Sequence, residues 1–339
     1  MTQGKSQQIK FPAHKEPRVW FVTCVTSPIG ISLCRHALEH GDFVAGGVPS
    51  GDASPTFTEF LEQLRGEPLW ASRLSLIALD SRNVANSQSA VAEAVNKFGR
   101  IDILFCCDSE VVIGTIEELS QDSRTRALVH DQFESNFFGP VNVIRTALPV
   151  LRKQNNGHIL LLSAITGHLG TPGLGMYCAS QWAIEGYCDS LAYEVAPFNI
   201  KITILQPNME VTVFTHKITS VPPMSAYAEG TNPAPLSRNI FSGLLDRLEG
   251  TAEPTLGDQL HSNEVTSIYP PLSSAMTERL VAETVHAVLS IGGHENPPVR
   301  HIVGVEGVTA VMEKLKTVSK ELEDFVECSN AVDYEPSKG

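Results

Sequence analysis

The feature that most constrains this chain is an alternation of short apolar runs with spans of helical periodicity. The runs are rich in Val, Ile, Leu and aromatic residues and lack a polar face, which is typical of strands buried on both sides of a sheet. We predict strands at 18–25, 42–48, 73–80, 101–107, 158–165 and 199–207. Strands that alternate with helices of this length form right-handed βαβ units. The sequence therefore predicts an α/β, doubly wound parallel sheet.

Helix start and stop signals lie between these strands. Ser27 and Pro28 provide an N-cap and a first helical residue, and Gly41 provides a stop. Further helices are expected at 84–99, at 123–153 and at 177–195. Each has the apolar spacing of a helix that packs one face on a sheet.

The character of the chain changes between about Val213 and Pro271, where prolines, serines and short apolar islands dominate. A helix at 276–293, a strand at 297–307 and an amphipathic helix at 308–327 follow. A stretch like 213–271 inside a compact domain is either disordered or a functional lid. We predict a flexible head at 1–16, one domain at 17–327 with 213–271 as an insertion that covers substrate, and a tail at 328–339. A second independent domain is the weaker reading.

Composition excludes several classes of function. With 25 Lys and Arg against 38 Asp and Glu, the net charge of -13 argues against nucleic-acid binding. No apolar stretch is long enough for a membrane span. The seven cysteines form no CxxC pair, and the histidines lack metal-ligand spacing, so we expect a reduced, cytoplasmic protein without a metal site. The adjacent Cys106 and Cys107 lie on a predicted buried strand, where packing is a more typical role than redox chemistry.

Several segments, in this order, resemble the short-chain dehydrogenase/reductase family. The segments that carry the resemblance are TCVTSPIG (23–30), Leu79-Asp80, FGRIDIL (98–104), ESNFFGP (134–140), LSAITGHLGTPGLGMYCASQ (162–181) and QPNMEVT (206–212). The tail is similar to that of extended members, including fungal ones of secondary metabolism. The resemblance implies a Rossmann-type fold, a nicotinamide cofactor, and a homodimer or homotetramer formed through helices at 121–153 and 177–195.

The resemblance also implies catalytic residues. Tyr177 matches the proton donor and Asn136 the residue that completes the proton relay. Gln181 stands where the family has a Lys, which lowers the Tyr pKa and binds the ribose. Ala164 stands where the family has a Ser, and Ser163, one residue earlier on a strand, points to the opposite face. His168, on the loop that borders the family's substrate pocket, is a further candidate acid or base.

The cofactor positions implied by the resemblance are partly altered. Ile29 and Gly30 are kept, whereas Cys24 and Pro28 replace glycines, and Pro28 removes an N–H that could face phosphate. The other expected cofactor contacts are Asp80, Asn136, Tyr177, Gln181 and Thr212. The segment at 45–50 has neither an Arg for a 2′-phosphate nor an acidic residue for a 2′-hydroxyl, so NADP(H) and NAD(H) both stay open.

Two interpretations of function follow. The first is a reductase that uses NAD(P)H to reduce a hydrophobic ketone, such as a polyketide, terpenoid or lipid-like compound, in secondary metabolism. The second is a repurposed family member, either a binding or scaffold protein or a non-redox isomerase, cyclase or dehydratase that uses His168 and Tyr177. The altered phosphate loop, Ser position and Lys position keep the second interpretation open.

Overall fold

A computed structural model describes residues 16–49, 55–227, 237–247, 260–270 and 272–330. The elements used below are β1 (Val19–Val22), β2 (Phe43–Val48), β3 (Leu74–Ala78), β4 (Ile103–Cys106), β5 (Val111–Ile113), β6 (Gly157–Leu162), β7 (Ile200–Gln206), β8 (Ile218–Ser220), β9 (Thr266–Ile268), β10 (Arg300–Ile302), α1 (Pro28–His40), α2 (Pro55–Gly66), α3 (Pro68–Arg73), α4 (Val84–Phe98), α5 (Ser123–Phe133), α6 (Gly139–Gln154), α7 (Gly175–Val195), α8 (Met209–Phe214), α9 (Ser237–Arg247), α11 (Ser274–Ile291), α12 (Val305–Asp324) and α13 (Val326–Asn330).

The predicted parallel sheet is confirmed. Its strand order is β10-β7-β6-β4-β1-β2-β3, and every neighbouring pair is parallel. One row of aligned residues across the middle of the sheet runs from Val22 through Phe105 and Leu160 to Thr203. Because all strands run the same way, the loops after β1, β4, β6 and β7 meet at one edge. Ligands of doubly wound sheets bind at this carboxyl edge.

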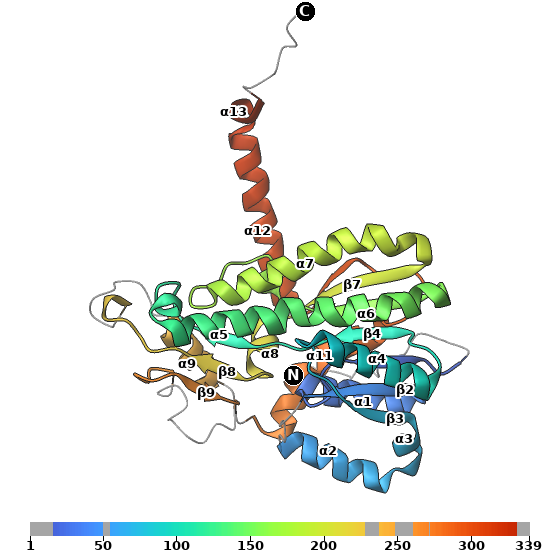
Figure 1. Cartoon of the computed structure of the whole chain (residues 1–339). Coiled ribbons are helices and arrows are strands. Elements are labelled where there is room, and N and C mark those ends of the chain that lie inside the picture. Colours follow the sequence, from blue (N-terminus) through green and yellow to red (C-terminus); the bar gives the residue numbers. More distant parts are fainter. Residues whose placement is uncertain (1–15, 50–54, 228–236, 248–259, 271, 331–339) are drawn as a thin grey trace, which may run out of the picture.

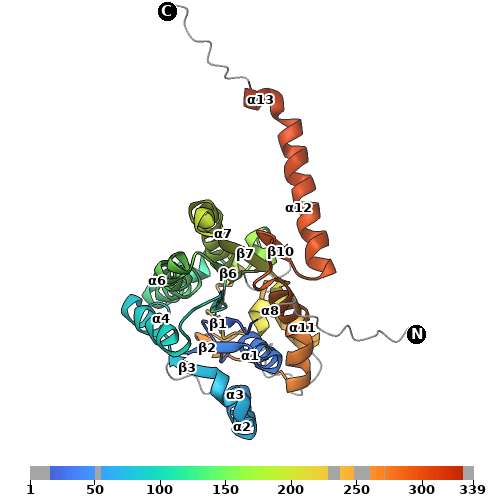
Figure 2. The ribbon, with the colours of Figure 1, turned by 90° about the vertical axis from the view of Figure 1, so that its right-hand side faces the viewer.

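Helices cover both faces of the sheet, as Figure 2 shows from one end. One apolar cluster joins α1, α2 and α11 to one face, and a second joins α4, α6 and α7 to the other. This double cover explains why β1, β4 and β6 are buried along their whole length. The apolar runs recognised in the sequence are therefore the middle layer of a three-layer fold.

The predicted limits of α1 are confirmed residue by residue. Ser27 is the N-cap, since its Oγ accepts a hydrogen bond from the N–H of Gly30, and Pro28 occupies the first turn. Gly41 ends the helix at φ +97, a backbone conformation that favours glycine. These signals are local in sequence, so they could be read without tertiary information.

The helix expected at 123–153 is interrupted. Asp122 caps α5, and the chain passes through one π-helical turn, Glu134–Phe138, before α6. A π-helical turn inserts an extra residue into the helical repeat and is frequent at functional sites. Here the turn contains Asn136.

Two features were not predicted. The short helices α2 and α3 fill the connection between β2 and β3, and α2 inserts Phe57, Phe60 and Leu64 into the core beside α1. A second, smaller sheet forms from β5, β8 and β9, with β5 and β8 parallel and β8 and β9 antiparallel. Figure 1 shows this small sheet with α9 at the left end of the molecule, below α5.

The small sheet and α9 account for much of the expected insertion at 213–271. Residues 228–236, 248–259 and 271 of that segment lie outside the described residues, as do 1–15 of the predicted head and 331–339 of the predicted tail. The last long helix, α12, projects away from the body in both views (Figures 1 and 2). Within the described residues we find no helix with the length and apolarity needed to cross a membrane.

Candidate active site

Three hydroxyl groups from three elements converge at the carboxyl edge of the sheet. Tyr177 lies in the first turn of α7, Ser109 follows β4, and Thr212 lies on α8. Tyr177 is only 1% exposed, and this burial raises the pKa of its hydroxyl, whereas interactions with Thr212 and Ser109 oppose the rise. The phenol is therefore a protonated hydrogen-bond donor at neutral pH.

Ser109 is the member of this group that the sequence analysis missed. Its Oγ lies beside the Tyr177 hydroxyl, yet it is buried and completes no hydrogen bond of good geometry. An unsatisfied buried hydroxyl is costly, and it suggests a polar ligand atom as the absent partner. The family pattern directs attention to position 164, which is a buried Ala here, so only the fold reveals Ser109.

Asn136 positions the segment that carries Ser109. Its side chain accepts a hydrogen bond from the N–H of Glu110 at 2.7 Å and donates one to the carbonyl oxygen of Glu110 at 2.9 Å. A further bond goes to Ser180 Oγ at 3.2 Å. The π-helical turn thus fixes the loop after β4 against α7, and Asn136 lies within the predicted site.

Apolar side chains lie around Tyr177. Tyr177 belongs to a buried cluster with residues from α8, β8, α9, β9 and the turn before β9, namely Val213, Phe214, Ile218, Phe241, Leu260 and Ile268. All six come from the insertion. Tyr177 therefore packs in an apolar cluster to which the insertion contributes.

Gln181 lies one turn after Tyr177 and is buried, so the site has an amide where the family has a positive charge. Ser163 donates a hydrogen bond to the buried carboxylate of Glu185, which lies two turns after Tyr177 on α7. Gln206 donates to both oxygens of Glu185, and His168 Nε2 lies 3.2 Å from Gln206 Oε1. His168 thus joins a separate polar network, and its catalytic role stays a prediction.

The loop that corresponds to the family's phosphate cradle is tightly packed. Thr23, Cys24, Val25 and Thr26 are all buried. Gly30 is the one position where the cradle's requirement for glycine persists, because a Cβ there would lie 2.0 Å from the carbonyl oxygen of Cys24. The substitutions Cys24 and Pro28 therefore preserve the close packing of α1 on β1 and reduce the backbone N–H groups that could face an anion.

A buried histidine that the sequence analysis missed, His216, lies beside this loop and links it to α8. His216 Nδ1 lies 2.7 Å from the carbonyl oxygen of Thr212, and Nε2 lies 3.2 Å from that of Cys107. Cys107 in turn donates its N–H to Thr23 Oγ1 at 3.0 Å. Burial lowers the pKa of His216, so this ring adds no positive charge to the site at neutral pH. No local motif marks it, because its partners are backbone atoms distant in sequence.

Acidic groups dominate the electrostatics of this end. Asp108 is partly buried beside Thr23, Ser81 and Cys24, and its removal from solvent raises the pKa of its carboxyl to about 6. The guanidinium of Arg82 donates hydrogen bonds to both oxygens of the Asp80 carboxylate. Arg82 Nε lies 2.9 Å from Asp80 Oδ1, and Arg82 Nη2 lies 3.1 Å from Asp80 Oδ2. This pairing lowers the pKa of Asp80 and occupies the oxygens that would face an adenine.

The residues present do not fit a whole dinucleotide. Tyr177 and Thr212, which the resemblance assigns to the nicotinamide, lie together, and Asn136 holds the neighbouring loop. At the expected phosphate end, a tightly packed loop, an ionisable Asp108 and an uncharged Gln181 oppose the binding of a pyrophosphate. Ile29, a further expected cofactor residue, is wholly buried in the core.

The remaining candidates have structural explanations. Cys106 and Cys107 are unpaired and buried, and burial raises the pKa of both thiols well above the usual value, which makes them unreactive packing residues. In the described part of the chain, no cluster of His, Cys, Asp or Glu could hold a metal ion.

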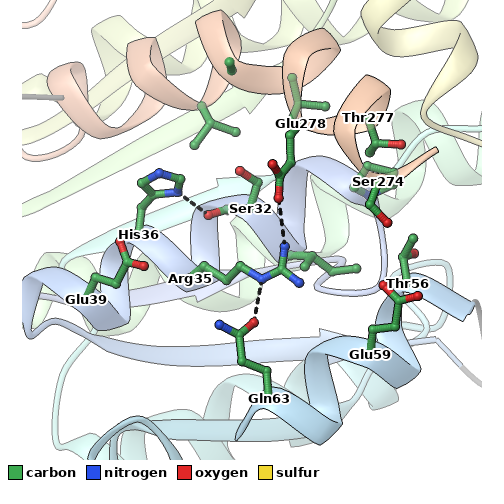
Figure 3. A pocket seen from close by; sticks show the side chains of 15 residues that line it. Ser32, Arg35, His36, Glu39, Thr56, Glu59, Gln63, Ser274, Thr277 and Glu278 are labelled. Carbon is green, nitrogen blue, oxygen red and sulfur yellow. Dashed lines mark hydrogen bonds and ion pairs between the residues drawn. The ribbon is translucent and has the colours of Figure 1, made fainter. Parts of the chain in front are cut away.

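Two hollows lie elsewhere on the surface. The larger, about 690 Å³, is a groove between α1, α2 and α11, and the other, about 450 Å³, lies between α4 and α6. Figure 3 shows Arg35 at the centre of the larger groove, where it joins Gln63 of α2 to Glu278 of α11. The polar side chains that line this groove already bind one another across it, and these contacts connect α1 to α2 and α11.

Comparison with known proteins identifies the family. The sequence signature described as short chain dehydrogenase matches residues 18–222. Oxidoreductase BOA17 of Botryotinia fuckeliana is 27% identical over 314 residues, which are 93% of this chain and 98% of that protein. Human retinol dehydrogenase 8 is 29% identical over 76% of this chain and 80% of its own length.

A solved structure shows the same fold. The crystal structure of a short-chain dehydrogenase from Streptomyces avermitilis matches 94% of this chain and 100% of its own, with a TM-score of 0.63 at 24% identity. The match covers the sheet and the helices on both of its faces. Together with the signature over more than half of the sequence, it shows that this chain belongs to the short-chain dehydrogenase family.

Proposed function

We propose that this protein is an oxidoreductase that reduces a bulky, apolar ketone, with Tyr177 as the proton donor. The observation that carries the proposal is the pair of hydroxyls at Tyr177 and Ser109, one a protonated donor and the other without a hydrogen bond of good geometry, beside an apolar cluster. Family membership supports the reaction class. Two relatives, named retinol dehydrogenase 8 and 3-ketodihydrosphingosine reductase, support an apolar substrate class such as a polyketide, terpenoid or lipid-like ketone.

The residues of the chain account for the proton half of this reaction. The substrate carbonyl oxygen would accept hydrogen bonds from Tyr177 and Ser109, and Tyr177 would transfer its proton as negative charge develops on that oxygen. Burial raises the pKa of Tyr177, which keeps the hydroxyl protonated at neutral pH, the state that reduction of a ketone requires, although it also makes the phenol a weaker acid. Asn136 would hold Ser109 in place through its two bonds to Glu110.

The hydride half belongs to a nicotinamide cofactor, NADP(H) or NAD(H), in this family. Because the phosphate loop is tightly packed, we expect such a cofactor to bind weakly and only after this loop rearranges. The insertion at 213–271 would act as the cover of the substrate site, since its residues form most of the apolar cluster around Tyr177. A cytoplasmic location, secondary metabolism and a dimer formed through α6 and α7 stay predictions.

The tightly packed phosphate loop also favours a second candidate function. A hydroxyl cluster beside apolar side chains could bind an apolar ligand or shift protons on it without hydride transfer. In this alternative no dinucleotide has to bind. The uncharged side chain of Gln181 and the burial of residues 23–26 are then compatible with the function.

The test is a turnover assay with NADPH or NADH and a panel of ketones graded from short and polar to long and apolar. The proposal expects nucleotide oxidation that rises with the apolar size of the ketone. Absence of oxidation above background with every ketone, in a protein that binds the same ketones, would instead establish the second candidate.

A further inference from the structure

The projecting helix α12 has an apolar side that the described part of the chain leaves exposed. Its first turns pack on the body, where Gly307 lies against Asn208 and Ile165, and Val311 is 2% exposed. Beyond them the helix leaves the body (Figures 1 and 2), and Leu315, Leu322 and Phe325 are 54%, 66% and 63% exposed. A helix of this length is marginally stable alone in water, and most helical stability comes from packing an apolar face.

The apolar residues of this region follow a heptad repeat. They alternate at intervals of three and four residues, in the order Val308, Val311, Leu315, Val318, Leu322 and Phe325. This spacing places all six on one seam, which is the pattern of helices that pair through interlocking side chains. The seam continues past the body contact at Val311 to the end of the helix.

The charges of α12 indicate what covers the seam. Three lysines are outnumbered by five acidic residues, so anionic lipid would be repelled rather than attracted. Lys314 and Glu321 flank the seam at equivalent heptad positions, one repeat apart. Two such helices that run in opposite directions bring each Lys314 to the Glu321 of the other. In a parallel pair, Lys314 would face Ser319 instead, and no opposite charges would meet.

We propose that α12 pairs in antiparallel fashion with α12 of a second copy of this chain. In this register Leu315 packs against the second copy's Val318, and Leu322 and Phe325 of each copy lie beside the first turns of the other, next to the body contact at Val311. The two-fold axis passes between Leu315 and Val318, so both copies contribute the same surface. This interface is distinct from the one expected at α6 and α7, and it does not rest on the proposed reaction.

Sedimentation equilibrium of the full chain tests the pairing. The double variant Leu315→Glu/Leu322→Glu places charge in the seam, and we expect it to weaken self-association at least about 100-fold. Leu69→Glu, at an exposed leucine of α3, is the matched control and should leave association unchanged. Since all three leucines are exposed, the far-ultraviolet circular dichroism should stay that of the folded protein.

Charge exchange tests the direction of the helices. Lys314→Glu and Glu321→Lys each set like charges against each other twice in an antiparallel pair, so each variant should associate about tenfold more weakly. An equimolar mixture of the two should recover the wild-type affinity, because every contact then joins opposite charges. A mixture no tighter than its components would overturn the antiparallel arrangement. Two results would overturn the pairing itself: a monomeric wild type, or a self-association that is equally strong in the wild type and in Leu315→Glu/Leu322→Glu. A monomeric protein that binds phosphatidylcholine vesicles through α12 would overturn it as well.

Discussion

The two ends of the candidate site lie on the same edge of the same sheet, yet they differ in what their polar groups do. At the Tyr177 end, the Ser109 hydroxyl lies beside the phenol and completes no hydrogen bond of good geometry. At the phosphate-loop end, Thr23 and Cys107 bond to each other, and Ser27 caps α1. The Tyr177 end therefore offers the Ser109 hydroxyl as a hydrogen-bond donor to a ligand. At the phosphate-loop end, the polar groups already bond to other groups of the protein.

The difference teaches that substitutions can preserve a fold while they alter a ligand site. Pro28 and Ser27 make a good helix start, so α1 forms as in the family although the loop has fewer N–H groups for an anion. Function therefore has to be argued from the groups at the site and not from the fold. The predictions below test whether the two ends differ as strongly as the contacts indicate.

The largest effect is expected at Tyr177. Tyr177→Phe removes the proton donor and should lower kcat for ketone reduction by about 10²- to 10⁴-fold. Loss of the hydroxyl should cost only about 1 kcal/mol of unfolding free energy. Steady-state kinetics and a urea titration measure the two effects. Tyr187→Phe, on the same helix, is the matched control, and equal losses in both variants would refute a specific role for Tyr177.

The next effect concerns Asp108 beside the phosphate loop. Removal from solvent raises its pKa from 3.8 to about 6, so between these pH values the folded protein holds more protons than the unfolded chain. Stability from this group is therefore lost as pH rises from about 4 to about 6, by about 3 kcal/mol at about 1.4 kcal/mol per pH unit.

Asp108→Asn removes this pH dependence. The free energy of unfolding of the wild type minus that of the variant should fall by about 3 kcal/mol between pH 4 and pH 7. Urea titrations at several pH values measure it. The variant Asp122→Asn should show the opposite trend, because hydrogen bonds at the α5 N-cap lower the pKa of Asp122. A constant difference for Asp108→Asn would show that this carboxyl is not desolvated.

A smaller effect is expected at Ser109. Ser109→Ala removes one hydrogen bond to the developing negative charge and should reduce kcat about 10- to 100-fold, at the lower end of losses for such donors because Tyr177 remains. Ser190→Ala, at an exposed serine of α7, is the control. If kcat is the same in Ser109→Ala and the wild type, the Ser109 hydroxyl does not contact a substrate oxygen.

The fold was largely predictable because its signals are local or periodic. Ser27, Pro28 and Gly41 mark α1 directly, and the apolar runs mark the sheet. The helix α2 was missed although Phe57, Phe60 and Leu64 have helical spacing, because a segment rich in Gly, Ser and Pro precedes it. The three-residue strands of the small sheet are too short for any periodic signal.

The site was predictable only where it follows the family pattern. The positions of Tyr177, Asn136 and Gln181 could be assigned by spacing from neighbouring motifs. Ser109 and His216 could not, since their importance depends on contacts between segments far apart in sequence. The orientation of Asp108 and the pairing of Asp80 with Arg82 likewise depend on tertiary packing that no spacing rule contains.

The most direct test of the central difference is calorimetric titration of NADPH into the wild type and into Pro28→Gly/Gln181→Lys. The double variant restores an N–H to the loop and a positive charge beside Tyr177. We expect weak wild-type binding, with a Kd of about 0.1 to 1 mM, and a gain of at least about tenfold, or 1.4 kcal/mol, in the variant. A low-micromolar wild-type Kd that the two changes do not improve would contradict the claim that the phosphate end is closed.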